Sequence, residues 1–273
     1  MSILAGGVWC DAAFRNRMQS DTPIVGSTVL NQYAQLVPDP LGRPYNVLRT
    51  YCAQGVYAAL GTDGAKRAEV QAQSTVETWG TTYVHHWRIV VPSDWINYGA
   101  SSYAVVAQCH DVNVGAVGRR PTLACEVING VLSWNMSNTA NTGGVNVYSK
   151  PIGAGQELEF TLIVRWADGT NDAAANGRFD LYDGDALVYS LTGQKNTWDG
   201  NASTEPNPPY IKAGIYQPNT GDGWWAGRQL AMCHVASIVG TADETPASLR
   251  AWVNARLAAN SNAPRPPYVP AGM

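Results

Sequence analysis

Short runs of β-branched and aromatic residues, separated by turn-forming residues, constrain the fold of this chain more than any other feature of its sequence. Such runs are typical of strands, and between residues 46 and 240 they do not alternate with helical patterns. They occupy residues 47–52, 83–91, 103–110, 122–128, 158–166, 178–189, 210–216 and 232–239. Many strands without intervening helices predict an all-β sandwich or jelly roll.

Two local patterns add a hairpin and a helix to this prediction. Asp183-Gly184-Asp185 interrupts the run at 178–189 and is typical of a hairpin turn. Further on, Thr245 and Pro246 suit the N-cap and the first position of a helix. Apolar residues then recur at helical spacing, at Leu249, Trp252, Val253 and Leu257. We therefore expect one C-terminal helix packed on the outside of the sandwich.

The chain has 273 residues, which is enough for one domain with a sizeable core. We expect four regions. Residues 1–45 are punctuated by Pro and Gly and should form an irregular segment, which could serve as an attachment arm. Residues 46–240 should form the sandwich, 241–259 the packed helix, and 260–273 a tail rich in Pro and Asn.

The composition limits the partners of the protein. Charged residues make up 14% of the chain and the net charge is −3, so no overall positive field would attract nucleic acid. An anionic ligand would have to be recognised locally. Ten Trp and thirteen Tyr accompany only three Phe, which suits a sugar-binding surface, although the cores of β proteins are also rich in aromatic residues.

The cysteines do not form a recognisable framework. The five are dispersed, without a closely spaced pair, so buried thiols are expected, while one disulfide is compatible with the sequence. We expect neither a metal site nor a cofactor. Since His85 and His86 are adjacent, they should face opposite sides of a strand, which makes a metal site formed by that pair improbable.

The sequence also bears on location. It has no apolar segment of the ~20 residues that a membrane span needs. The first residues lack the basic stretch that precedes the apolar part of a secretory signal. We expect an extracellular protein or a virion component, which could form a homo-oligomer or contact other virion proteins.

Three strand-like segments carry polar residues at a spacing of two, which places them on one face of a strand. Gln108 and His110 share a face, and Cys109 points the other way. In the segment 210–217, one face carries Tyr210, Lys212, Gly214 and Tyr216, and the other carries Ile211, Ala213 and Ile215. The second of these faces suits a hydrophobic core, and Gly214 would leave room for a ligand near the backbone.

The third segment is 66–71, in which Arg67, Glu69 and Gln71 share a face. Taken alone, an alternating strand often has merely a solvated polar face. Taken together, the three segments supply a guanidinium, an amide, an imidazole, an ammonium and a phenol. Such a set could bind a sugar carboxylate and remove a proton beside it.

These segments resemble the signature strands of the jelly-roll polysaccharide lyases, which include alginate lyases and relatives that act on heparin and glucuronan. The matching stretches, in the order typical of the family, are Arg67-Ala68-Glu69-Val70-Gln71, Gln108-Cys109-His110 and Tyr210-Ile211-Lys212-Ala213-Gly214-Ile215-Tyr216-Gln217. The likeness covers roughly residues 46–240. It implies a concanavalin A-like jelly roll with an acidic polysaccharide in a groove. Gln71 stands where alginate lyases carry a second Arg, which weakens the expected neutralisation of the carboxylate.

The resemblance also implies β-elimination. Gln108 and Arg67 would hold the uronate carboxylate, and His110 would assist neutralisation or act as a base. Tyr216 would remove the C5 proton or protonate the leaving oxygen, helped by the charge of Lys212. We expect further substrate contacts from Glu69, Gln71, Tyr210, Trp224 and Trp225; Tyr103 and Trp166 could also line the groove, unless they pack in the core.

Two main hypotheses follow, beside that of a plain structural sandwich. The first is an active lyase for a uronate-containing polysaccharide, favoured by Gln108, His110, Lys212 and Tyr216. The second is a non-catalytic carbohydrate-binding relative, such as a bacteriophage tail or surface protein that attaches to host polysaccharide, favoured by Gln71. Release of unsaturated uronate distinguishes the first from the other two.

Overall fold

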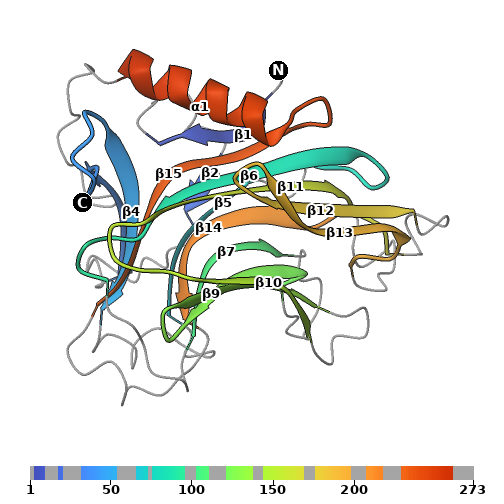
Figure 1. The fold of residues 1–273 in the computed structure, drawn as a ribbon, viewed down its shortest axis with the longest axis horizontal. Coiled ribbons are helices and arrows are strands. Elements are labelled where there is room, and N and C mark those ends of the chain that lie inside the picture. The colour runs from blue at the N-terminus through green and yellow to red at the C-terminus, as the bar shows by residue number, and fades with distance from the viewer. Residues whose placement is uncertain are drawn as a thin grey trace.

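Two antiparallel sheets form the body of this computed structural model (Figure 1). The structure describes residues 3–9, 18–20, 32–53, 66–72, 76–95, 103–110, 121–137, 144–168, 176–197, 207–217 and 229–260. The predicted jelly-roll sandwich with one C-terminal helix is thereby confirmed. Within the described residues, no helix has the length and apolar character needed to cross a membrane.

The larger sheet, sheet A, has eight strands in the order β13-β12-β11-β6-β15-β4-β3, with β1 paired to β15. The strands are β1 Ile3–Val8, β3 Gln32–Pro38, β4 Asn46–Ala53, β6 Thr82–Val90, β11 Glu157–Arg165, β12 Gly177–Asp183, β13 Ala186–Gln194 and β15 Gln229–Thr241. The turn between β12 and β13 lies where Asp183-Gly184 predicts it, and Gly184 takes the left-handed conformation with φ 59°.

The smaller sheet, sheet B, has seven strands in the order β10-β9-β8-β7-β14-β5-β2. They are β2 Met18–Ser20, β5 Lys66–Ala72, β7 Ala104–His110, β8 Leu123–Ile128, β9 Val131–Ser137, β10 Gly144–Pro151 and β14 Tyr210–Gln217. The three segments singled out in the sequence are therefore the adjacent strands β7, β14 and β5.

The main core lies between the two sheets and is rich in aromatic residues. Trp87 of β6 contacts Trp134 of β9 with ring centroids 5.2 Å apart, and Trp134 meets Phe160 of β11 edge-on at 5.3 Å. All three side chains are fully buried. Aromatic rings bury large apolar areas, so these residues hold sheet B against sheet A.

A second apolar layer lies on part of the outer face of sheet A. Helix α1, Pro246–Asn260, buries Leu249, Val253 and Leu257 against residues of sheet A (Figure 1). Its N-terminus is capped as predicted, because the Thr245 Oγ1 accepts a hydrogen bond from the Ser248 backbone N–H at 3.1 Å. The Ser248 hydroxyl accepts one in return from the Thr245 N–H at 2.8 Å.

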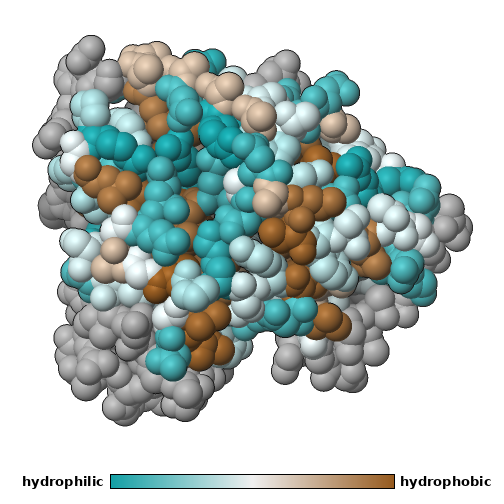
Figure 2. Space-filling view, in the orientation of Figure 1, coloured by the Kyte–Doolittle hydropathy of each residue, from teal (hydrophilic) through white to brown (hydrophobic). Residues whose placement is uncertain are grey.

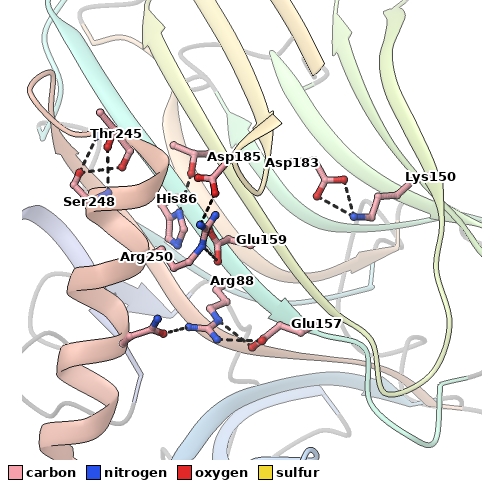
Figure 3. A network of polar contacts seen from close by, with 12 residues as sticks. His86, Arg88, Lys150, Glu157, Glu159, Asp183, Asp185, Thr245, Ser248 and Arg250 are labelled. Carbon is pink, nitrogen blue, oxygen red and sulfur yellow. Dashed lines mark hydrogen bonds and ion pairs between the residues drawn. The ribbon is translucent and has the colours of Figure 1, made fainter. Parts of the chain in front are cut away.

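Charged side chains fasten this helix to the sheet (Figure 3). Arg250 binds Glu159 of β11 at 2.7 Å and Asp185 at 2.8 Å. Arg88 of β6 binds Glu157 and also donates to Asn254 of the helix at 2.6 Å. Hydrophilic residues accordingly spread across this side of the molecule below the helix (Figure 2). Helix α1 thus covers part of the outer face of sheet A, and that part has a structural role.

The expectation of an irregular segment at residues 1–45 is wrong in part. The described residues of that segment include β1, β2 and β3, which pair with β15, β5 and β4. Gly6 has a φ of 74°, and an added Cβ would meet the Ser237 carbonyl oxygen at 1.9 Å, so this glycine permits close pairing instead of breaking the strand. Pro38 ends β3, and the following turn leads into β4.

Candidate functional site

The polar residues of β5, β7 and β14 meet on the face of sheet B that points away from the core. In β14, Ile211, Ala213 and Ile215 are buried in the core. The alternation of a strand therefore turns Tyr210, Lys212 and Tyr216 toward the outer face, as the sequence predicts. The strand register sets Lys212 beside Gln108 of β7 and Tyr210 beside His110.

A buried ion pair with an amide lies at the centre of this face. The Gln108 amide Nε2 donates a hydrogen bond to Oε1 of Glu69, and the Lys212 ammonium lies 4.0 Å from Oε2 of the same carboxylate. Glu69 is 1% exposed and Lys212 is 3% exposed. A charge buried this deeply requires a partner, so each of the two ions stabilises the other in place.

This arrangement determines the orientation and the hydrogen-bonding role of the Gln108 amide. With Glu69 accepting from one N–H of the amide, the second N–H remains as a donor for another group. In the described structure, the Gln108 Oε1 is buried and accepts no hydrogen bond. Glu69 therefore orients the amide as a donor, which is the polarity that a bound carboxylate needs.

Half-buried rings surround the ion pair. The rings of His110 and Tyr210 have centroids 6.4 Å apart, and the Lys212 ammonium lies 5.6 Å from the Tyr210 ring centroid. A cation at that distance from an aromatic face is attracted to the ring. His110, Tyr210 and Tyr216 all retain partial exposure, so an imidazole and two phenols border the buried charges at the surface.

A bulge sets the position of Tyr216. Against β7, the register of β14 shifts between Ala213 and Tyr216, so that Tyr216 pairs with Val105. Gly214, within this bulge, has a φ of 150°, a conformation that glycine adopts far more readily than other residues. Toward β5 the register is regular, and Tyr216 pairs with Arg67 and Lys212 with Gln71.

Arg67 and Gln71 are placed by their backbone pairing alone, and Trp224 and Trp225 lie outside the described residues. Trp166, which could have lined a groove, is instead fully buried in the core, where its indole N–H donates to Glu77 at 3.1 Å. Across the described part of the chain, no group of three His, Cys, Asp or Glu side chains could hold a metal ion.

The sequence did not predict the polar contacts on the core side of β7. His85 of β6 bridges Glu77 at 2.8 Å and the Cys109 thiol at 3.3 Å, and all three are buried between the sheets. Cys109 thus faces the core, as predicted, between the outward-facing Gln108 and His110. His86 faces the other way and contacts Thr161 at 3.0 Å, which agrees with the predicted alternation. Glu77 precedes β6 and belongs to none of the motifs, so no sequence signal pointed to it.

The described cysteines are buried thiols. Cys109, Cys125 and Cys233 are free, in agreement with the sequence, while the side chains of Cys10 and Cys52 lie outside the described part. Burial raises the pKa of the Cys125 thiol well above its ordinary value and that of Cys233 to about 12. These two thiols are consequently poor nucleophiles and are not part of the candidate site.

Comparison with known proteins relates the sequence to a protein family and the fold to solved structures. The polysaccharide lyase family matches residues 9–229. An endo-β-1,4-glucuronan lyase from the fungus Trichoderma reesei superposes with a TM-score of 0.57 at 17% identity, over 81% of this chain and 91% of that one. A family 7 alginate lyase in complex with its product gives a TM-score of 0.52 at 14% identity, over 75% and 82%. No curated protein sequence matches significantly.

Proposed function

Because the chain belongs to the polysaccharide lyase family, we propose that it binds a uronate-containing polysaccharide on the outer face of sheet B and cleaves it by β-elimination. The observation that carries this proposal is the buried group of Gln108, Glu69 and Lys212, bordered by the half-buried His110 and Tyr216. Similar folds belong to lyases whose names specify glucuronan and alginate, both acidic polymers.

The first task of such a site is to stabilise negative charge on the substrate carboxylate. Removal of the proton at C5 of a uronate leaves an electron pair that the adjacent carboxyl group must accept. The free N–H of Gln108 can donate to that carboxyl group, since Glu69 holds the amide in the donor orientation. We assign Arg67, whose backbone pairs with Tyr216, to the same task, because a guanidinium pairs with a carboxylate bidentately.

The second task is proton transfer. A base takes the C5 proton, the electron pair forms the C4–C5 double bond, and the bond from C4 to the bridging oxygen breaks as that oxygen gains a proton. We assign these transfers to Tyr216 and His110, which are partly exposed beside the ion pair. A phenol with a pKa of ~10 is only about 0.1% ionised at pH 7, so Tyr216 needs nearby positive charge to act as a base. Lys212, on the same face of β14, is the described cation nearest in sequence.

A specific observation also supports the non-catalytic alternative. Gln71 pairs with Lys212 at the position where the family resemblance predicts a second Arg, so this strand brings one cation fewer to the face. Fewer cations would weaken stabilisation of the intermediate more than binding of the ground state, because charge develops during the reaction. A binding protein at a cell surface or in a virion, either as a monomer or in an assembly, would have this character.

The test is to incubate the protein with alginate, glucuronan, hyaluronan and heparin, and to follow the ultraviolet absorbance of unsaturated uronate. Tyr216→Phe removes one hydroxyl and should lower the rate by at least ~10²-fold, since general acid–base catalysis contributes that much. Tyr182→Phe on β12 of sheet A is the matched control and should keep full activity. Binding of a polymer without release of any product would refute the lyase and support the binding protein.

A further inference from the structure

A row of polar side chains continues from the candidate site across the other half of sheet B. Strand register joins Gln108 of β7 to Ala124 of β8, Ala124 to Asn135 of β9, and Asn135 to Asn146 of β10. Directly paired residues of an antiparallel sheet point to the same face. Asn135 and Asn146 therefore lie on the face that carries Gln108, two and three strands away, with ~4.8 Å per strand.

These two amides belong to a hydrogen-bonded group that we call the polar ladder, formed by Glu126, Ser133, Asn135, Asn146 and Ser149. The Ser149 hydroxyl donates to Asn146 Oδ1 at 3.2 Å, and Asn146 Nδ2 donates to Asn135 Oδ1 at 3.0 Å. Asn135 Nδ2 in turn donates to Glu126 Oε2 at 2.7 Å. Ser133 joins through the Ser149 hydroxyl at 2.9 Å.

The direction of these bonds gives the ladder a definite polarity. Each amide donates one N–H toward Glu126, so the series of hydrogen bonds ends at a carboxylate. Within the ladder no side chain is cationic. The nearby Lys150 of β10 pairs instead with Leu132, on the opposite face, and binds Asp183 of sheet A at 2.7 Å. The ladder thus carries one carboxylate, that of Glu126, among uncharged amides and hydroxyls, whereas the group around Gln108 contains the Lys212 ammonium.

The ladder is also accessible. Asn146 and Ser149 are exposed, and Glu126, Ser133 and Asn135 are half-buried. In the strand register of the described residues, the small, buried side chain of Ala124 lies between Gln108 and Asn135. A polymer bound at Gln108 and running across the strands would reach the ladder after about two strand spacings, a distance comparable with one or two sugar units.

We propose that the polar ladder is a subsite for an uncharged sugar, so that the preferred substrate is a heteropolymer in which uronates alternate with neutral sugars. This inference rests on the proposed function. Sugar hydroxyls can donate to the acceptors of the ladder, whereas a second uronate carboxylate would meet Glu126 as a like charge. The ladder therefore distinguishes this chain from a protein suited to a polymer of uronates alone.

Hyaluronan and glucuronan test the proposal directly, because glucuronate alternates with N-acetylglucosamine in the first and is the only sugar in the second. We expect kcat/KM for hyaluronan to exceed that for glucuronan by roughly tenfold, which corresponds to ~1.4 kcal/mol. Glu126→Gln should reduce this ratio to about threefold or less, and Asn146→Lys should invert it by attracting the second carboxylate. Asp185→Asn removes one carboxylate from the turn of sheet A and should leave the ratio unchanged.

The outcomes separate this proposal from the function on which it rests. Cleavage of both polymers with a ratio that neither Glu126→Gln nor Asn146→Lys alters would overturn the subsite and leave the lyase intact. If neither polymer is cleaved, the ratio of their dissociation constants is measured for the same variants, and the same shifts support the subsite. If neither polymer is bound, the subsite is refuted, and the proposed function then depends on the results with alginate and heparin. Thermal melting of each variant confirms that it is folded.

Discussion

Glu69→Gln is the substitution that most sharply probes the centre of the site. The amide keeps the volume of the side chain and can still accept from Gln108, but it leaves Lys212 as a buried ammonium that has lost its carboxylate. Two unit charges 4.0 Å apart interact by about 4 kcal/mol at an effective dielectric constant of ~20. Removing one partner of a buried pair commonly costs ~3–5 kcal/mol, so we expect a loss of roughly 3–4 kcal/mol in the free energy of unfolding.

Denaturant unfolding of four proteins measures this quantity: the wild type, Glu69→Gln, Lys212→Met and the double variant. The double variant should recover much of the loss, because it removes both charges together, and the resulting cycle isolates the coupling between them. Asp94→Asn is the control, since its carboxylate is well exposed in a pair with Arg49 and should contribute at most ~1 kcal/mol. A loss below ~1 kcal/mol for Glu69→Gln, with no coupling to Lys212, would refute the buried ion pair.

Three other predictions concern the scaffold. Burial lowers the pKa of both His86 and His234 to about 3, so below pH ~6.5 the unfolded chain binds more protons than the folded protein. The free energy of unfolding should therefore fall by about 1.4 kcal/mol per pH unit for each ring as the pH decreases. Unfolding free energies that stay constant between pH 7.5 and 5 would contradict this. Thr245→Ala should cost about 1 kcal/mol by removing the helix cap, measured by denaturant unfolding, and an unchanged midpoint would count against the cap. Glu77→Ala should cost roughly 2–5 kcal/mol in the same assay, because His85 and the Trp166 indole lose their buried acceptor; a value below 1 kcal/mol would argue against this contact.

The sequence predicted those parts of the fold in which local pattern and tertiary structure agree. In β14, the alternation of Ile211, Ala213 and Ile215 with polar residues matches a strand with one buried face. The Thr245 cap and the Asp183-Gly184 turn are also local, since each depends on a few adjacent residues. Such features require no knowledge of the distant chain, and the structure agrees with all of them.

Features that depend on pairing with distant residues were missed. β1 and β3 contain or end in Gly and Pro, which locally indicate irregular structure, but the partner strands β15 and β4 stabilise them. The hairpin of β8 and β9 is an exception, because it turns at Asn129-Gly130, where both residues have positive φ, and Asn-Gly is a local turn signal. β10 was missed because its outward residues are polar and Val147 is the one buried side chain of this strand.

In the candidate site, too, local features were predicted and contacts between distant residues were not. Alternation alone placed Gln108 with His110 and Lys212 with Tyr216 on shared faces, while the adjacency of β7, β14 and β5 followed only from the family resemblance. The contact of Glu69 with both Gln108 and Lys212 was not predicted, because the sequence does not show which strand lies beside which. For the same reason the polar ladder, which joins three strands, left no signal in any single one of them.

The most direct test of the central claim, that the face formed by β5, β7 and β14 performs β-elimination, is mass spectrometry of the oligosaccharides released from a uronate polymer. Elimination adds no water, so the account predicts fragments that end in an unsaturated uronate and are lighter by one water than hydrolysis products. Gln108→Ala should abolish these fragments while the protein stays folded. Fragments with saturated ends, or unsaturated fragments released equally by Gln108→Ala, would contradict the account.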